Sequence, residues 1–335
     1  MAIAIWSYPK QTHFKAVKGE LRKHKLLDTE LLKDSFVITP YKHYEQGFYS
    51  ISNSGAQIIE KTKDWLKKNL GGLRAHEPIE ELPEYTSQID FALFELTTDD
   101  NFEKVVFSRC KDQAHGGFNY NWLEQLRSAY PNAFISLVSD ENLGTWITAS
   151  PELYLHRKKS YFKSYSLAGT KFDQNTKLGA KEQEEQGIVT DFIVEAFDAC
   201  GLDVAVKNGV EHKAGTLTHL LNVVEGQVTD KPFDLQMLFL GLHPTPAVCG
   251  FPRPWAKDFL SFEGYNRELY TGFLGEFKSE EDFEFYVNLR CAQIFDSHIR
   301  FYAGAGITKH SVPEKEFLET EAKMSVLQSV LLSHQ

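Results

Sequence analysis

The sequence predicts an α+β fold in which antiparallel strands predominate. Short alternating runs of apolar residues follow one another between residues 104 and 169 and return between residues 284 and 307, whereas few stretches have helical spacing. A parallel sheet would require strict alternation of strand and helix, which this chain lacks. The composition is that of a globular protein, because 42% of the 335 residues are hydrophobic and 24% are charged.

The periodicity from which helices and strands are predicted is much clearer after residue 90 than before it. Residues 1–70 have no clear periodicity, and the Gly-, Pro- and acid-rich residues 69–90 predict a linker or surface excursion. We therefore divide the chain into 1–90, a divergent N-terminal part of the same domain, and 91–335, the better patterned region. The strands predicted in that region lie at residues 104–110, 133–139, 145–150 and 152–169.

One long helix is predicted at residues 181–201. Ile188, Phe192 and Ile193 recur there at helical spacing, and Gly201 stands where a helix would end. A second helix is predicted after the glycines of "RFYAGAGITKHSVPEKEFLETEAK", residues 300–323.

Charge and cysteine content limit the partners and the compartment. A formal net charge of -10 argues against nucleic-acid binding and against anionic membranes. The four cysteines form no metal-binding spacing and are expected to be free thiols of a reducing compartment: Cys110, Cys200, Cys249 and Cys291. With neither a signal-peptide pattern nor an apolar run of membrane-spanning length, we expect a soluble, cytoplasmic monomer.

Common cofactor motifs are missing from the sequence. No GxGxxG follows a strand, and neither GxxxxGK[ST] nor HExxH occurs. Dinucleotide binding, P-loop phosphate binding and zinc-peptidase chemistry therefore lose their main sequence support.

Two predicted helices each carry a Glu-x-x-Glu pair. In residues 300–323, Gly304 and Gly306 predict a tight backbone bend, and Glu316, Glu319 and Lys323 then fall on one helix face. The other pair is Glu182 and Glu185. Either pair alone is more often a solvated surface. If the four carboxylates converge, their repulsion would require a hard cation such as Mg²⁺.

Further polar residues stand at the starts of strands or in a constrained loop. Lys104 begins an apolar strand: its ammonium either reaches solvent or, held inside a site, serves as a general base. Glu152 is either an exposed turn acid or a proton donor. His219 and the loop "LHPTPAVCGFP", which holds Thr245, are either structural or part of a site.

Seven motifs together resemble the chorismate-utilising enzymes. This family includes isochorismate synthases, salicylate synthases, anthranilate synthase large subunits and aminodeoxychorismate synthases. The match covers roughly residues 100–330, in the family's order and approximate spacing. The motifs are "KVVFSR", "SPELYL", "SLAGT", "THL", "HPTPAVCG", "ELYTGFLG" and "FYAGAGI…EKEFLETEAK".

The resemblance implies two largely antiparallel sheets packed face to face, with helices outside, and a Mg²⁺-dependent reaction on chorismate. By motif, Glu185 and Glu319 would bind the metal. Glu182 and Glu316 would hold its waters. Tyr270 and Arg290 would bind the enolpyruvyl carboxylate, a task that suits the fork of arginine. The remaining substrate contacts implied are Gly169, Thr170, His219, Thr245, Gly304, Gly306 and Lys323.

Two positions favour water as the nucleophile. Lys104 stands where the ammonia-using anthranilate enzymes have Gln, and Ala168 where aminodeoxychorismate synthases have a nucleophilic lysine. The resemblance thus implies an isochorismate synthase in which Lys104 activates water and Glu152 protonates the departing hydroxyl. A salicylate synthase and a non-catalytic chorismate-binding protein are the alternatives. Gln186 departs from the histidine common in relatives.

Overall fold

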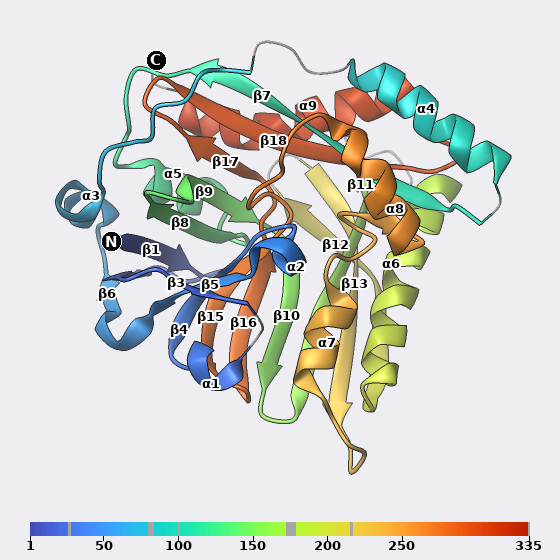
Figure 1. The fold of residues 1–335 in the computed structure, drawn as a ribbon, viewed down its shortest axis with the longest axis horizontal. Helices are drawn as coiled ribbons and strands as arrows, with labels where there is room; N and C mark the ends of the chain where they lie inside the picture. The colour runs from blue at the N-terminus through green and yellow to red at the C-terminus, as the bar shows by residue number, and fades with distance from the viewer. Residues whose placement is uncertain (26–27, 80–83, 100, 172–178, 215–216, 334–335) are drawn as a thin grey trace.

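Two antiparallel sheets packed face to face form the protein, with helices on their outer sides, which confirms the predicted α+β architecture (Figure 1). The computed structural model describes residues 1–25, 28–79, 84–99, 101–171, 179–214 and 217–333. All strand pairs within this described part of the chain are antiparallel.

The described strands divide equally between the two sheets. The first sheet has the spatial order β14 (Gly250–Phe251), β7 (Lys104–Ala114), β18 (His298–Ile307), β17 (Cys291–Ile294), β9 (Gly144–Ser150), β8 (Phe134–Asp140), β1 (Ala2–Ser7), β2 (Phe14–Gly19) and β6 (Gln57–Ile59). The second has the order β12 (Leu202–Ala214), β13 (Leu217–Val228), β11 (Tyr161–Lys171), β10 (Leu153–Lys158), β16 (Asp282–Val287), β15 (Phe273–Ser279), β4 (Ser35–Thr39), β5 (Phe48–Ser52) and β3 (Arg22–His24).

The helices vary from one turn to five. They are α1 (Thr29–Leu32), α2 (His43–Gln46), α3 (Thr62–Asn69), α4 (Tyr85–Thr98), α5 (Trp122–Ala129), α6 (Ala180–Ala199), α7 (Leu235–Leu242), α8 (Arg253–Phe259) and α9 (Pro313–Leu331), with 3-10 turns η1 (Asn53–Gly55) and η2 (Leu260–Glu263). No helix in the part of the chain that the structure describes is long and apolar enough to cross a membrane.

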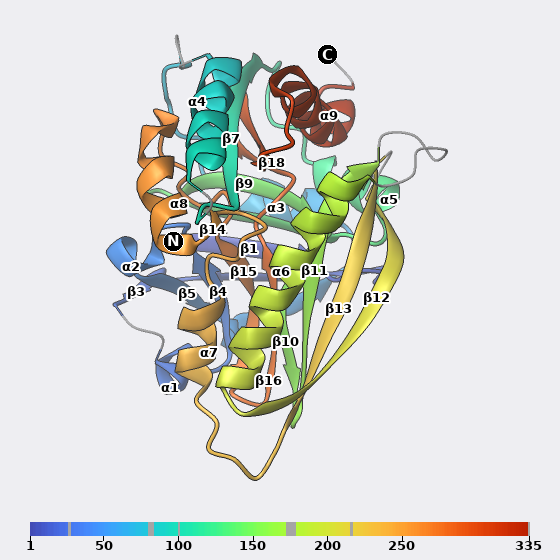
Figure 2. The same cartoon turned by 90° about the vertical axis from the view of Figure 1, so that its right-hand side faces the viewer.

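Apolar clusters hold these layers together. Between the sheets, aromatic side chains such as Trp6 and Phe36 meet with ring centroids 4.7 Å apart. Helices α5 and α9 cover the outer face of the first sheet. Helices α6 and α7 cover the outer face of the second, and α4 and α8 pack beside β7 and β18. Figure 2 shows α6 lying along β10 to β13, with α4 and α9 at one end of the molecule.

The first ninety residues supply strands to both sheets. β1 pairs with β8, and β4 pairs with β15, so this part of the chain is built into the same two layers as the rest. The predicted linker is partly wrong, because α4 begins at Tyr85, inside residues 69–90. Residues 70–79 have no helix or strand, and the Ile79 amide donates to Asp112 at 2.8 Å.

The later elements follow the sequence predictions closely, with one correction. Helix α6 spans Ala180–Ala199, and strands β7 to β11 occupy the predicted positions. The bend expected at Gly304 and Gly306 is wrong, because both glycines lie inside β18 and pair with Ser108 and Val106 of β7. All four cysteines are free, and Cys200 alone is only half-buried.

Candidate active site

A small cavity brings together most of the predicted site residues. Its walls come from β7, β18, β11, α6 and α9, together with the loops before β10, β14, β15 and β17. The predicted residues that line it are Glu152, Glu185, Tyr270, Arg290, Gly304, Gly306, Glu319 and Lys323. Its volume is only about 70 Å³, which is less than typical ligand sites of roughly 300 Å³ or more.

Lys104 lies beside the cavity and is completely buried. Its Nζ atom lies 2.9 Å from Oε1 of Glu185, and its side chain has no solvent-exposed surface. The alternative that this ammonium reaches solvent from the strand edge is therefore wrong. A buried charge requires a partner of opposite sign, and Glu185 on α6 supplies it.

Gly306 makes this contact possible because it has no side chain. A Cβ atom there would lie 2.2 Å from Oε1 of Glu185 and 2.9 Å from Cε of Lys104. At Gly304, a Cβ would lie 2.9 Å from the Phe107 carbonyl oxygen and 3.2 Å from the Tyr270 hydroxyl. The glycines of β18 thus provide room for site side chains rather than a bend.

Glu152 is an acid held in its protonated form. It is 3% exposed, and this burial raises the pKa of its carboxyl from 4.5 to about 8, against the opposing effects of Lys104, Lys323 and Arg290. The alternative of an exposed turn acid is therefore wrong. At pH 7 a carboxyl with this pKa is mostly neutral and can donate a proton.

Arg290 and Thr271 line the cavity with unusual backbone conformations. Their φ angles are +46° and +62°, a left-handed region that is uncommon for residues other than glycine and rarer still for a β-branched one. Such conformations cost roughly 1–3 kcal/mol each and cluster at binding sites. Burial lowers the pKa of Arg290 to about 10, although Glu319, Tyr270 and Glu152 oppose this effect. The guanidinium therefore stays charged at neutral pH.

Tyr270 lies beside Arg290 in the cavity wall. It is 2% exposed, and its ring stacks on Tyr302 with centroids 5.3 Å apart. Burial raises the pKa of Tyr270, so its hydroxyl keeps its proton at neutral pH. A neutral hydroxyl next to a guanidinium is a suitable donor pair for a carboxylate.

Three of the four predicted metal-site glutamates, Glu185, Glu316 and Glu319, are paired with lysines. Glu319 contacts Lys323 at 2.7 Å, and the buried Glu316 contacts Lys181 at 2.5 Å. Lys323 also donates to the Gly304 carbonyl at 2.8 Å. Burial raises the pKa of Glu316, and Lys181 opposes that effect. The solvated-face alternative for Glu316, Glu319 and Lys323 is therefore wrong.

Glu182 has a different contact from the other three glutamates. Its carboxylate accepts a hydrogen bond at 2.7 Å from the Gly179 amide, at the N-terminus of α6. Among the described residues, no three acidic, His or Cys side chains converge as a metal site. Glu185 and Glu319 nevertheless both line the cavity. That donor set fits Mg²⁺, which uses one or two carboxylates together with water and substrate oxygens.

The remaining predicted residues lie outside the cavity wall or outside the described side chains. Thr245 is buried, its hydroxyl has no hydrogen-bond partner within the described part of the protein, and it lies two residues before Ala247, which lines the cavity. Thr170 and His219 face each other in the β11–β13 register. The burial of Gly169 and the side chains of Thr170 and His219 lie outside what the structure describes.

Gln186 stands where relatives commonly have histidine, and its side-chain amide is hydrogen-bonded within the protein. It is 2% exposed and donates to the Ser166 carbonyl at 2.7 Å and to the Ser166 hydroxyl at 3.1 Å. This contact fixes α6 to β11 one residue after Glu185. Sequence reasoning missed Lys181, whose only signal was its position in the first turn of a helix that carries Glu182 and Glu185.

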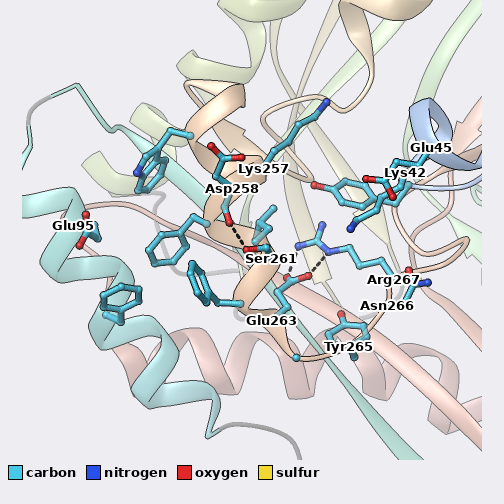
Figure 3. A pocket seen from close by; sticks show the side chains of 17 residues that line it. Lys42, Glu45, Glu95, Lys257, Asp258, Ser261, Glu263, Tyr265, Asn266 and Arg267 are labelled. Carbon is cyan, nitrogen blue, oxygen red and sulfur yellow. Dashed lines mark hydrogen bonds and ion pairs between the residues drawn. The ribbon is translucent and has the colours of Figure 1, made fainter.

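A larger groove, of about 1120 Å³, lies on the outside of the first sheet's edge, between α4, α8 and η2 (Figure 3). None of the predicted site residues lines it. Arg267 and Glu263 form a buried ion pair in its wall, and both also bind β7: Arg267 donates to the Val106 carbonyl and Glu263 accepts from the Ser108 amide. The ion pair of Arg267 and Glu263 therefore holds β7, the strand that begins with Lys104, in place.

Comparison with known proteins identifies the family. The family model described as "Chorismate binding enzyme" matches residues 28–332. With the two-sheet fold and the carboxylate- and lysine-lined cavity, this match shows that the chain belongs to the chorismate-binding enzyme family.

Isochorismate synthases are among the curated relatives of the chain. The chain is 34% identical over 197 residues to isochorismate synthase DhbC of Bacillus subtilis, covering 55% of this chain and 49% of the relative. It is 31% identical over 254 residues to isochorismate synthase EntC of Escherichia coli, covering 71% of this chain and 65% of the relative. The aligned regions thus span about half to two thirds of these relatives.

The fold is shared with a solved structure of the menaquinone-specific isochorismate synthase MenF from Escherichia coli. The TM-score is 0.81 at 22% identity, and the alignment covers 99% of this chain and 89% of that one. Anthranilate synthase component I from Streptococcus pneumoniae has the same fold, with a TM-score of 0.69 at 16% identity over 92% of this chain and 82% of that one.

Proposed function

We propose that this protein is a Mg²⁺-dependent isochorismate synthase. It adds water at C2 of chorismate and releases the C4 hydroxyl, so that the product is the isomer isochorismate. One observation carries the proposal: the buried acid Glu152 lines the cavity, and the completely buried lysine Lys104 lies beside the same cavity, 2.9 Å from Glu185 in its wall. A reaction that takes a proton from water and gives one to a leaving hydroxyl needs such a pair.

Lys104 is the proposed base and Glu152 the proposed acid. Lys104 takes a proton from the water as its oxygen bonds to C2. Glu152 donates its proton to the C4 oxygen as that carbon–oxygen bond breaks, and water leaves. In this structure Glu185 is the partner of Lys104. If Glu185 held the metal instead, Lys104 would lose this partner, and its amine is the group that we propose to accept the proton.

The remaining residues bind and orient the substrate. Arg290 and Tyr270 hold the enolpyruvyl carboxylate, because they place a charged fork and a neutral hydroxyl in the same wall. Glu185 and Glu319 would hold Mg²⁺, with Glu182 and Glu316 beside them. When bound, the metal would neutralise the ring carboxylate of chorismate. The contacts of Glu182 with Gly179 and of Glu316 with Lys181 would have to change for this role.

Two alternatives keep the same site. A salicylate synthase would form isochorismate and then eliminate pyruvate in the same cavity. One relative, from Pseudomonas aeruginosa, is named a salicylate biosynthesis isochorismate synthase, at 29% identity over 245 residues. A non-catalytic chorismate-binding protein is the third possibility, which the buried Lys104 and Glu152 disfavour. We propose menaquinone or siderophore biosynthesis as the pathway that the product enters.

Product analysis tests the proposal. The purified protein is incubated with chorismate and MgCl₂, and the products are separated by liquid chromatography. We expect isochorismate as the accumulating product. Salicylate with pyruvate would favour the first alternative, and unchanged chorismate would contradict any catalytic function.

The metal requirement has its own control. Glu319→Ala, or excess EDTA with the wild-type protein, should abolish turnover. Glu321→Ala is the matched control, because Glu321 lies two residues away on α9 but pairs with Arg109 and Lys111 outside the cavity. Full turnover in excess EDTA would contradict the role of the metal.

A further inference from the structure

Lys181 is a largely buried cation to which the proposed reaction assigns no role. It stands in the first turn of α6, and Figure 2 shows that end of the helix directed toward α9. Its Nζ atom lies 2.5 Å from Oε1 of Glu316, and its side chain is 18% exposed. By contrast, Lys104 pairs with Glu185 and Lys323 pairs with Glu319. Both of these lysines already have a proposed role, in the reaction or in substrate binding.

The ammonium of Lys181 lies beside the proposed metal ligands on both helices. It contacts Glu316 of α9, and on α6 it stands one residue before Glu182 and one helical turn before Glu185. Glu182, Glu185 and Glu316 are three of the four glutamates assigned to the metal and its waters. Lys181 itself does not line the cavity.

We propose that Lys181 is a tethered counter-ion that competes with the divalent cation for the glutamates of α6 and α9. The inference rests on the proposed metal site. A divalent cation that approaches these carboxylates meets a fixed positive charge whose repulsion is only partly screened at a buried site. Lys181 therefore weakens cation binding and, in the cation's absence, limits the repulsion among the carboxylates.

Two possible roles of Lys181 predict opposite changes in cation affinity when the lysine is removed. If Lys181 served only to hold Glu316 in place, its loss would disorder a carboxylate beside the metal and weaken cation binding. Competition predicts that its loss strengthens binding, because a positive charge disappears from the site while Glu185 and Glu319 remain. The direction of the change in cation affinity therefore separates the two roles.

The test measures Mn²⁺ binding without substrate. The wild-type protein and the Lys181→Met variant are titrated with Mn²⁺ at one pH, and free Mn²⁺ is followed by electron paramagnetic resonance. We expect the dissociation constant to fall by about 10- to 100-fold in the variant. Lys207→Met is the matched control, because Lys207 is 65% exposed and pairs with Glu225 in the β12–β13 hairpin. It should bind Mn²⁺ like the wild-type protein.

Two further variants separate charge from hydrogen bonding. Lys181→Gln keeps a donor to Glu316 without the charge, so it should bind Mn²⁺ as tightly as Lys181→Met does. Lys181→Arg keeps the charge and should stay within about threefold of the wild-type protein. Unchanged or weaker binding in both neutral variants would overturn this inference and leave the proposed function intact. Absence of Mn²⁺ binding in the wild-type protein and in all variants would overturn both.

Discussion

Replacing Glu152 with glutamine should make the protein more stable while removing most of its activity. The unfolded chain ionises this carboxyl above about pH 4.5, whereas burial raises the folded-state pKa to about 8. Between these values only the folded state keeps the proton, so the free energy of unfolding decreases as the pH rises. At about 1.4 kcal/mol per pH unit, Glu152 costs about 3 kcal/mol at pH 7 and about 5 kcal/mol above pH 8.

The glutamine side chain has nearly the same shape and cannot ionise, so Glu152→Gln escapes this cost. It also cannot donate the proton that the proposed reaction gives to the departing hydroxyl. We expect kcat to decrease by about 10²–10⁴-fold. In the wild-type protein, activity should decline as the pH rises through about 8, where the free Glu152 carboxyl loses its proton.

Urea unfolding at several pH values measures the effect on stability. The stability gain of Glu152→Gln over the wild-type protein should be small at pH 5 and increase steadily to pH 8. Glu141→Gln is the matched control, because Glu141 is exposed in the turn between β8 and β9. A gain that does not change with pH, or a variant less stable than the wild-type protein at pH 8, would refute the assignment of Glu152 as a buried, protonated acid.

Three other substitutions test the rest of the site. Lys104→Ala should lower kcat by about 10²–10⁴-fold, and near-native conversion of chorismate would exclude Lys104 as the base. Arg290→Ala should chiefly raise KM, because substrate binding should lose about 2–5 kcal/mol of free energy. An unchanged kcat/KM would place Arg290 outside the substrate site. Gly306→Ala should lower kcat by at least about 10-fold, because the new Cβ would lie 2.2 Å from Glu185. Its control is Gly187→Ala on α6, where a Cβ meets nothing within 4 Å, and equal activity of the two variants would contradict this account of Gly306.

The parts of the fold with clear periodicity were predictable from sequence. Strand β7 and helices α6 and α9 have apolar residues at the spacing of their own element, so their positions follow from local pattern alone. Strands β1 and β4 were not predictable. They are short, and one of the two partners of each, β8 for β1 and β15 for β4, lies more than a hundred residues further along the chain. A local pattern contains no information about such distant partners.

The site was predictable in composition but not in its contacts. Motif resemblance grouped Lys104, Glu152 and Glu185, and in the structure Glu152 and Glu185 line one cavity with Lys104 beside Glu185. The bend at Gly304 and Gly306 was wrong because the meaning of a strand glycine depends on what faces it, here Glu185 and Tyr270.

The ion pair between Lys181 and Glu316 was also beyond sequence reasoning. Its partners lie 135 residues apart on two helices whose packing no local pattern fixes. The lysine itself looked like an ordinary residue in a charged first helical turn. The fold supplies the information that the local sequence lacks, by bringing the side chains of Lys181 and Glu316 into contact.

The central claim is that water attacks C2 of chorismate, and isotope labelling tests it most directly. The protein is incubated with chorismate and Mg²⁺ in water enriched in ¹⁸O, and the isochorismate formed is analysed by mass spectrometry and carbon NMR. We predict one ¹⁸O atom in the product, bonded to C2, and none in the recovered chorismate at early times. Isochorismate without ¹⁸O would show that the C4 hydroxyl moves without exchange with solvent and would contradict the assignment of Lys104 as the base that activates water.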